Sequence, residues 1–146
     1  MSQRLEANTV SYDLMEYLGE GLNSVVYKAV RSDRFKHLQQ TIALKVLKSK
    51  NLVDIWKEEF ASLEQVNCKH CVRLYGFEWV GDRPALVLKY VSGLSLRQLC
   101  LAGPLPLTLA NELLAQIQAG LNSLREHGIC HGDLSPNNIM INDDGC

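Results

Sequence analysis

The chain has 146 residues, about one domain's worth, with 15 Lys plus Arg against 16 Asp plus Glu and a formal net charge of -1. Apolar residues make up 47% and charged residues 21%, which is ordinary for a globular domain and argues against a disordered tail. The balanced charge predicts no nucleic-acid or anionic-membrane partner, no apolar run is long enough to span a bilayer, and the N-terminus lacks the apolar stretch of a secretory signal. We therefore expect a cytoplasmic domain.

The first ninety residues alternate between strand patterns and turns. Five strands are predicted, at 10–18, 25–30, 41–47, 72–80 and 85–91, with a hairpin turn at 19–23, a surface loop at 31–40 and a turn at 81–84. Between the third and fourth strands, Trp56, Phe60, Leu63 and Val66 recur at spacings of 4, 3 and 3, which predicts a helix over about 52–66.

Helices dominate the remainder of the chain. A short helix is expected over 96–102 and a longer one over 107–127, which ends at Gly128 and has no capping box at its start. One face of the longer helix is apolar: Ala110, Leu113, Leu114, Ile117, Leu121 and Leu124. Residues 129–146 read as a loop followed by a short strand at 138–141. Strands first and helices later indicate an α+β domain.

The five cysteines are Cys68, Cys71, Cys100, Cys130 and Cys146. An odd number in a chain without an export signal favours free thiols in a reducing compartment. The Cys68-Lys69-His70-Cys71 segment has the spacing of half a zinc site, but no second Cys/His pair with matching spacing follows. We interpret these residues as ordinary cysteines near a helix end.

The predicted hairpin turn contains the segment Gly19-Glu20-Gly21. Glycines at this spacing let backbone amides approach a polyphosphate without an intervening Cβ. Ser24 stands where a third glycine is usual, and a strand rather than a helix follows, so the segment differs from a Rossmann loop. Taken alone, the same pattern also describes a simple turn.

Lys45 is a single lysine in an otherwise apolar strand. Burying its ammonium group is costly unless an anion meets it, so either the amine reaches water at an edge position or it has an acidic partner. Glu58 and Glu59 on the predicted helix are the candidates, with nucleotide phosphates as a further source of charge. Glu59 lies closer to the buried stripe and is favoured, whereas Glu58 is expected to be solvated.

A third candidate segment is His131-Gly132-Asp133-Leu134-Ser135-Pro136-Asn137-Asn138. Pro136 excludes a regular helix here, so the segment is a loop that precedes a strand. Asp133 could accept a proton from a hydroxyl group, and the Asn138 amide oxygen could bind Mg²⁺. The same residue types are also common in turns without any chemistry.

Taken in order, these segments resemble the protein kinase superfamily over about residues 12–145. Gly19, Gly21 and Val26 match the glycine loop, and Ile42-Ala43-Leu44-Lys45 resembles the Val-Ala-Ile-Lys strand. His131, Asp133 and Asn138 match the catalytic-loop motif His-Arg-Asp-x-x-x-x-Asn. Leu88 falls at the gatekeeper position, and Lys89-Tyr90-Val91 at the hinge.

The resemblance implies a kinase-like α+β fold: a five-stranded antiparallel N-lobe sheet with one helix, then the first helices and catalytic loop of an incomplete C-lobe. The expected boundaries are 1–10 for an N-terminal tail, 11–91 for the N-lobe and hinge, and 92–146 for the start of the C-lobe.

The resemblance also implies phosphoryl transfer from ATP, with Mg²⁺, to a protein hydroxyl, of the serine/threonine type. Lys45 would hold the phosphates, Glu59 would orient Lys45, Asp133 would accept the hydroxyl proton and Asn138 would bind the metal. The implied ATP-binding residues are Leu18, Gly19, Gly21, Val26, Ala43, Lys45, Leu88, Tyr90 and Met140.

Two residues depart from the family pattern. Gly132 replaces the catalytic-loop arginine, and Ser135 stands where most protein kinases have a lysine. Both departures look like the RIO-type and aminoglycoside-phosphotransferase-like branches, so a small-molecule kinase of that kind is an alternative. The short link between residues 96 and 107 is similar to protein kinases and favours a protein substrate.

Asn142-Asp143-Asp144-Gly145 reads as the turn before the strand that leads to Asp-Phe-Gly in the family, and the sequence ends at Cys146 without that motif. The chain could be a piece of an active kinase, a nucleotide-binding or scaffolding pseudokinase module, or a minimal kinase completed by another chain. We expect the 146 residues alone to bind ATP weakly, to transfer phosphate slowly or not at all, and to associate through the uncovered face of the long helix.

Overall fold

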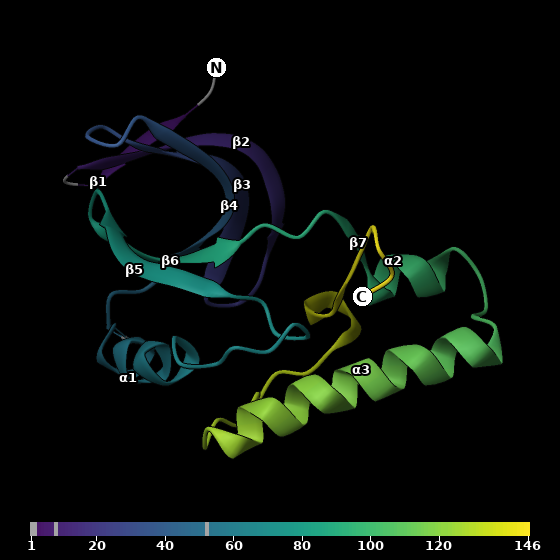
Figure 1. Cartoon of the computed structure of the whole chain (residues 1–146). Coiled ribbons are helices and arrows are strands. Elements are labelled where there is room, and N and C mark those ends of the chain that lie inside the picture. The colour runs from purple at the N-terminus through teal and green to yellow at the C-terminus, as the bar shows by residue number, and fades with distance from the viewer. Residues whose placement is uncertain (1–2, 8, 52) are drawn as a thin grey trace. The chain divides into compact units, whose positions relative to one another are not determined.

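A six-stranded antiparallel sheet is built from strands in the first ninety residues of the chain (Figure 1). In this computed structural model, residues 3–7, 9–51 and 53–146 are described, without the side chains of Glu6, Ile55 and Glu59. The strands are β1 (Arg4–Ala7), β2 (Val10–Glu20), β3 (Ser24–Asp33), β4 (Leu38–Leu47), β5 (Leu74–Val80) and β6 (Arg83–Lys89), in the spatial order β1-β2-β3-β4-β6-β5. The edge strands β1 and β5 also contact each other, so the sheet curls into a nearly closed barrel.

The inside of the curled sheet is the hydrophobic core of this unit. Successive side chains of a strand point to opposite faces, and on β4 the residues Ile42, Leu44 and Val46 are buried inside the curl. Ala43 and Lys45 therefore lie on the outer face, where both are half-buried. The predicted buried strand thus has one core face and one face available to a ligand.

Two predictions about this sheet were wrong. Residues 4–7 of the expected N-terminal tail form β1, which adds a sixth strand because Leu5 pairs with Tyr12 and packs on the core while Ala7 is buried. The expected surface loop at 31–40 belongs mostly to β3 and β4, whose backbones pair as far as Asp33 and Leu38. Backbone pairing needs no apolar side chains, so the polar composition of this hairpin misled the prediction.

Helix α1 (Val53–Leu63) packs against β5, where the rings of Phe60 and Phe77 meet edge to face with centroids 6.3 Å apart. The helix was expected over about 52–66, and it ends earlier, at Leu63, before a turn at 64–65. The N-terminal residue of that range, Leu52, lies outside the described residues.

Residues 65–72 and 91–146 form a second compact unit, which we describe by itself. It contains β7 (Gly93–Ser95), α2 (Leu96–Leu101), α3 (Leu107–Glu126), the 3-10 turn η1 (Pro136–Asn138) and β8 (Met140–Asn142). Strand β7, which was not predicted, pairs with β8. The expected strand at 138–141 begins two residues later because Pro136 starts the 3-10 turn.

Helix ends in the second unit follow local rules. Ser95 and Gln98 form a capping box at the start of α2 that the sequence reading missed. Helix α3 begins after Pro106 with no side-chain cap, as expected, and Gly128 follows its end with φ +72°. On its predicted apolar face Leu113 and Leu124 are buried, whereas Leu114 is 62% exposed.

Within the described residues, no helix is both long and apolar enough to cross a membrane.

The fold class was confirmed: the chain is α+β, with a curled antiparallel sheet followed by helices.

Candidate active site

The glycine loop joins β2 to β3. Gly21 N–H donates to the Ser24 carbonyl at 2.9 Å, which closes the turn. A Cβ built at Gly19 or Gly21 would meet no atom within 4 Å, so open space lies over the loop backbone. That space suits a polyphosphate chain, which needs close approach of the backbone.

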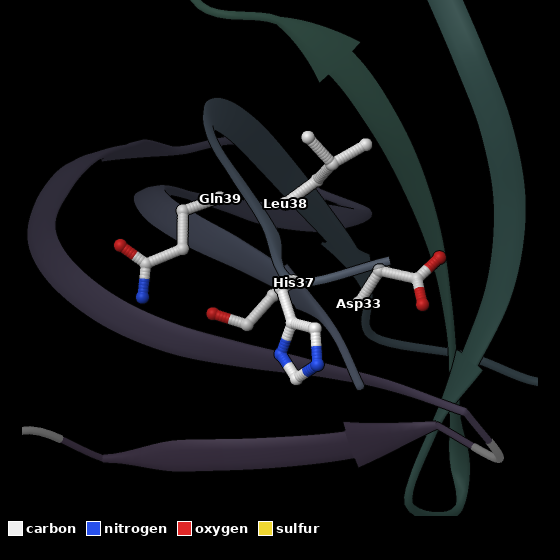
Figure 2. A pocket seen from close by; sticks show the side chains of 5 residues that line it. Asp33, His37, Leu38 and Gln39 are labelled. Carbon is white, nitrogen blue, oxygen red and sulfur yellow. The ribbon is translucent and has the colours of Figure 1, made fainter. Parts of the chain in front are cut away.

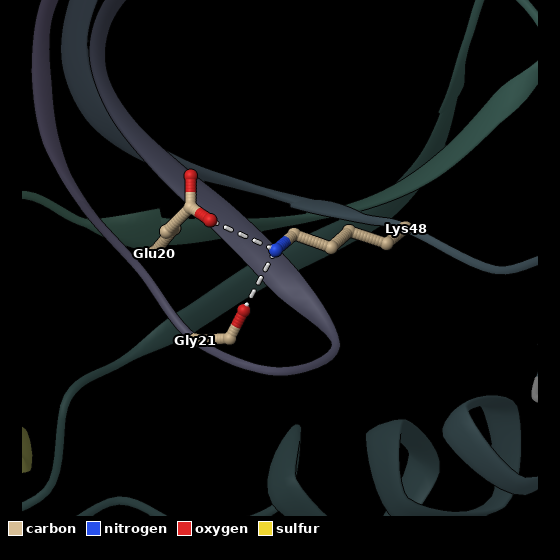
Figure 3. Close-up of polar contacts among 3 residues, drawn as sticks. All are labelled: Glu20, Gly21 and Lys48. Atoms are coloured by element: carbon tan, nitrogen blue, oxygen red, sulfur yellow. Dashed lines mark hydrogen bonds and ion pairs between the residues drawn. The ribbon is translucent and has the colours of Figure 1, made fainter.

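Lys48 ties the glycine loop to the end of β4 (Figure 3). Its Nζ donates to the Gly21 carbonyl at 2.9 Å and to Glu20 Oε1 at 3.1 Å, and its backbone N–H donates to the Asn23 carbonyl at 2.8 Å. The sequence reading missed this residue. One signal for it was available: Lys48 is a basic residue directly after the strand that ends at Leu47. Leu47 pairs with Ser24, which lies beside the glycine loop.

Four of the predicted ATP-binding residues lie on one face of the sheet. Val26 on β3 pairs with Lys45 on β4, and Ala43, two residues before Lys45, pairs with Leu88 on β6. Directly paired residues share a face, and this is the face opposite the core. The Lys45 ammonium group and an apolar surface thus lie side by side on this face. Strand β3 begins next to the glycine loop, and strand β4 ends next to it.

Two further predicted residues border this face. Tyr90 follows β6, and its ring centroid lies 4.7 Å from the Nζ of Lys28, which pairs with Ala43. Leu18 sits at an irregularity in the β2–β3 pairing, between Tyr17 and Gly19, and is 42% exposed.

The Lys45 ammonium lies over the indole ring of Trp56 on α1, with 5.3 Å from Nζ to the ring centroid. A cation over an aromatic face is stabilised by the ring quadrupole. Trp56 was expected on the packed face of the helix, but its contact with Lys45 was not foreseen. The side chain of Glu59 lies outside the described residues, so the proposed Lys45–Glu59 pair stays a prediction.

In the second unit, Asp133 and Asn138 are in direct contact. The Asn138 Nδ2 donates to the Asp133 carbonyl at 2.9 Å and to Asp133 Oδ2 at 3.1 Å. Because the amide nitrogen is occupied in this way, the Asn138 amide oxygen is the atom left to accept a cation. Hard oxygen ligands of this kind suit Mg²⁺, so the donor set fits the metal that the sequence implied.

The loop before Asn138 turns sharply at Gly132, whose φ is +73°. Asp133 N–H donates to His131 Nδ1 at 3.2 Å across this turn. A residue with a Cβ in this left-handed conformation costs about 1–2 kcal/mol, so the local backbone accounts for glycine where the family pattern has arginine.

The remaining predicted residue, Met140, lies on β8, where it pairs with Ser95 of β7 and is 37% exposed. The predicted site residues therefore form two groups. Lys45 and the residues around it belong to the sheet unit, and His131, Asp133, Asn138 and Met140 belong to the helical unit.

A pocket of about 320 Å³ lies elsewhere, on the β3–β4 hairpin (Figure 2). It is lined by Ser32, Asp33, His37, Leu38 and Gln39, at the opposite end of β3 from the glycine loop, and contains no predicted site residue. The Asp33 carboxylate accepts the backbone N–H groups of Phe35 and Lys36, which lowers its pKa. Asp33 thus serves to close the hairpin turn.

The described part of the chain holds no group of three or more His, Cys, Asp or Glu side chains placed to bind a metal ion. Cys68 and Cys71 are both free thiols.

The protein kinase domain model matches residues 12–146, and the chain belongs to the protein kinase family. A probable serine/threonine-protein kinase of Clostridium perfringens is 28% identical over 140 residues, which are 92% of this chain and 20% of that protein. The serine/threonine-protein kinase ULK3 of Homo sapiens is 31% identical over 133 residues, which are 88% of this chain and 28% of that protein. The chain thus spans about a fifth to a quarter of the length of these relatives.

Two solved structures share the fold. Rad53 in complex with AMP-PNP has a TM-score of 0.78 and 31% identity, over 91% of this chain and 35% of that one. The apo form of PpkA-294 has a TM-score of 0.75 at 20% identity, over 96% of this chain and 57% of that one, and bears on the fold alone.

Proposed function

We propose that this domain binds Mg²⁺-ATP and transfers the γ-phosphoryl group to a serine or threonine hydroxyl of a protein. The observation that carries most weight is the outer sheet face, where Lys45 stands with Val26, Ala43 and Leu88 next to an open glycine loop. The names of the relatives, which are serine/threonine-protein kinases, support the choice of a protein substrate.

Each residue has one task in this proposal. The Lys45 ammonium neutralises phosphate oxygens, and the apolar side chains of Val26, Ala43 and Leu88 bind the adenine ring. Leu18 and Met140 extend the adenine surface, and the hinge backbone at Tyr90 bonds the base edge. Glu59 orients Lys45.

The helical unit supplies the proton acceptor. The Asp133 carboxylate takes the proton of the substrate hydroxyl as its oxygen attacks. The Asn138 amide oxygen would hold Mg²⁺, which would supply neutralising charge at the phosphates. The Asn138–Asp133 hydrogen bonds hold both side chains in one orientation before substrate arrives. Positioning and charge neutralisation are the main contributions of a protein to phosphoryl transfer.

We further propose that the 146 residues by themselves turn over slowly. They contain no Asp-Phe-Gly motif, so within them Asn138 is the one metal ligand that the kinase pattern assigns. A second candidate is nucleotide binding without transfer, which Ser135 favours because most protein kinases have a lysine there that faces the transferred phosphate.

Two variants test the proposal and separate the candidates. Lys45→Met should abolish the thermal shift caused by Mg²⁺ and AMP-PNP, whereas Asp133→Asn should keep the shift and lose phosphoryl transfer from labelled ATP to a protein substrate. Lys50→Met is the matched control, because the Lys50 side chain forms an exposed ion pair with Asp82, with 3.3 Å between Nζ and Oδ2. Unchanged nucleotide binding by Lys45→Met would contradict the proposal, and binding without any Asp133-dependent transfer would favour the second candidate.

A further inference from the structure

The segment Cys68-Lys69-His70-Cys71 forms a tight turn. Cys71 N–H donates to the Cys68 carbonyl at 3.1 Å, with Lys69 and His70 as the central residues. A turn closed in this way keeps the first and last Cα atoms within about 7 Å. Disulfides join cysteines whose Cα atoms are about 4.4–6.8 Å apart, so the span of this turn is compatible with a bridge.

The two thiols also interact through their side chains. Burial, together with the charge and hydrogen bonding of the neighbouring Cys68 thiol, raises the pKa of Cys71 to about 11. Both thiols are free and partly accessible. The Cys71 thiol donates to the Gly120 carbonyl on α3 at 3.5 Å, which fixes the side of the turn on which it lies.

A third thiol lies in the same unit with a different partner. Cys146 Sγ is 3.4 Å from His70 Nδ1. Cys146 is therefore the natural competitor for a bridge to either cysteine of the turn, and the experiment must distinguish it.

We propose that Cys68 and Cys71 form a redox-active pair that reacts with small-molecule disulfides of the glutathione type and closes to an intramolecular disulfide. This activity is separate from phosphoryl transfer and does not rest on it. The site would take a disulfide as its oxidant and release two thiols.

The chemistry is thiol–disulfide exchange in two steps. The Cys68 thiolate attacks one sulfur of the small disulfide, whose S–S bond breaks, and the first small thiolate leaves and takes up a proton. Cys71 then loses its proton, and its sulfur attacks Cys68 Sγ and displaces the second small thiolate, which is protonated in turn. The pair of protein thiols is oxidised by two electrons and the small disulfide is reduced to two thiols.

The order of attack follows from the environment of Cys71. With a pKa of about 11, on the order of one Cys71 side chain in a thousand or fewer is a thiolate at pH 7.5. Cys71 is therefore the slow external nucleophile, but it is well placed as the resolving cysteine because its target sulfur is held beside it.

The test uses the full chain with the two exposed cysteines replaced, Cys100→Ser and Cys130→Ser, so that adducts at those positions do not obscure the result. The protein is treated with oxidised glutathione, quenched with acid and analysed by intact mass and by tryptic peptides without reduction. Trypsin cuts after Lys69, between the two cysteines, so the bridge keeps peptides 58–69 and 70–73 joined.

We expect the joined peptides and no retained glutathione in this background. Adding Cys71→Ser should leave one glutathione trapped on Cys68, and adding Cys68→Ser should leave Cys71 unmodified over the same time. Cys146→Ser should form the bridge as before. A bridge to Cys146, or a glutathione retained on Cys68 while Cys71 is intact, would overturn the proposal.

A second measurement covers the case in which the Cys71→Ser variant fails to fold. In the reduced background protein, iodoacetamide should alkylate Cys68 at least about tenfold faster than Cys71, because the thiolate is the reactive form. Faster alkylation of Cys71 would contradict the assigned order.

Discussion

Inside the curled sheet, the side chain of Tyr12 is fully buried, and its hydroxyl finds no hydrogen-bond partner among the described residues. Burial and the nearby Glu78 carboxylate raise the pKa of Tyr12 to about 12, against the opposing effect of the Arg31 guanidinium, which lies near the hydroxyl but outside hydrogen-bond geometry. An unpaired buried hydroxyl costs about 1–3 kcal/mol. The Tyr12 ring therefore contributes to the core, whereas its buried hydroxyl lacks a hydrogen bond and lowers the stability of the fold.

Tyr12→Phe should leave the free energy of unfolding at pH 7 unchanged or raise it by about 1–2 kcal/mol, because it removes that hydroxyl. The phenol ionises near pH 10 in the unfolded chain and near 12 in the fold, so the stability of the parent protein falls as the pH rises from 10 to 12, by roughly 2–3 kcal/mol. Urea unfolding across this range should show that Tyr12→Phe lacks this part of the fall. Tyr17→Phe, at a residue 56% exposed, should retain it.

The Lys48 side chain holds the glycine loop by contacts that are mostly exposed to solvent. Exposed ion pairs contribute about 0–1 kcal/mol, so Lys48→Met should change global stability by less than about 1 kcal/mol. Local order should change more, because the Gly21 carbonyl and the Glu20 carboxylate lose their shared donor. Hydrogen exchange measured by mass spectrometry should be several-fold faster in peptides covering 19–24, and unchanged there in Lys50→Met.

At the scale of elements, α3 meets the Cys68–Cys71 turn at Gly120. A Cβ built on Gly120 would lie 3.1 Å from the His70 carbonyl oxygen, tighter than an ordinary van der Waals contact. The absence of a side chain at this helix position lets the turn lie directly against the helix backbone. The contact was not foreseen because an isolated glycine in a helix carries no signal of what packs on it.

Gly120→Val should therefore lower the free energy of unfolding by about 1–3 kcal/mol through overpacking against the turn. Ala119→Val is the control for a valine at the preceding, exposed position of the same helix: it carries a helix-propensity cost of less than about 1 kcal/mol, whereas Gly120→Val gains slightly in helix propensity, so a larger loss at Gly120 reports packing. Urea denaturation monitored by circular dichroism compares the two. Equal losses in both variants would mean that Gly120 does not support the packing.

At the scale of the whole molecule, the proposed function assigns residues of both units to the binding of one nucleotide. Mg²⁺ with AMP-PNP should therefore slow hydrogen exchange in the glycine loop at 19–24 and in the loop at 131–140 in the same titration, with one apparent affinity. Lys45→Met should abolish protection in both segments. Protection of the glycine loop alone would contradict a shared site and favour nucleotide binding by the sheet unit without catalysis.

The sequence by itself determined the family, the five longer strands, the helices and the candidate residues. These features depend on hydrophobic period, glycine and proline positions and short motifs, which are local properties of the chain. The pairing that puts Val26, Ala43, Lys45 and Leu88 on one face also follows from the strand period, once the register is known.

Only the tertiary structure decided the features that join distant segments. Residues 4–7 became a strand because β2 offered an open edge and the core accepted Ala7, and Gly93–Ser95 became one because β8 lay opposite. Three other contacts have the same origin: the hydrogen bond from Lys48 to the glycine loop, the contact of Lys45 with the Trp56 ring, and the packing of the Cys68–Cys71 turn against Gly120. Such contacts depend on which residues the fold brings together, and the local pattern of any one segment does not contain that information.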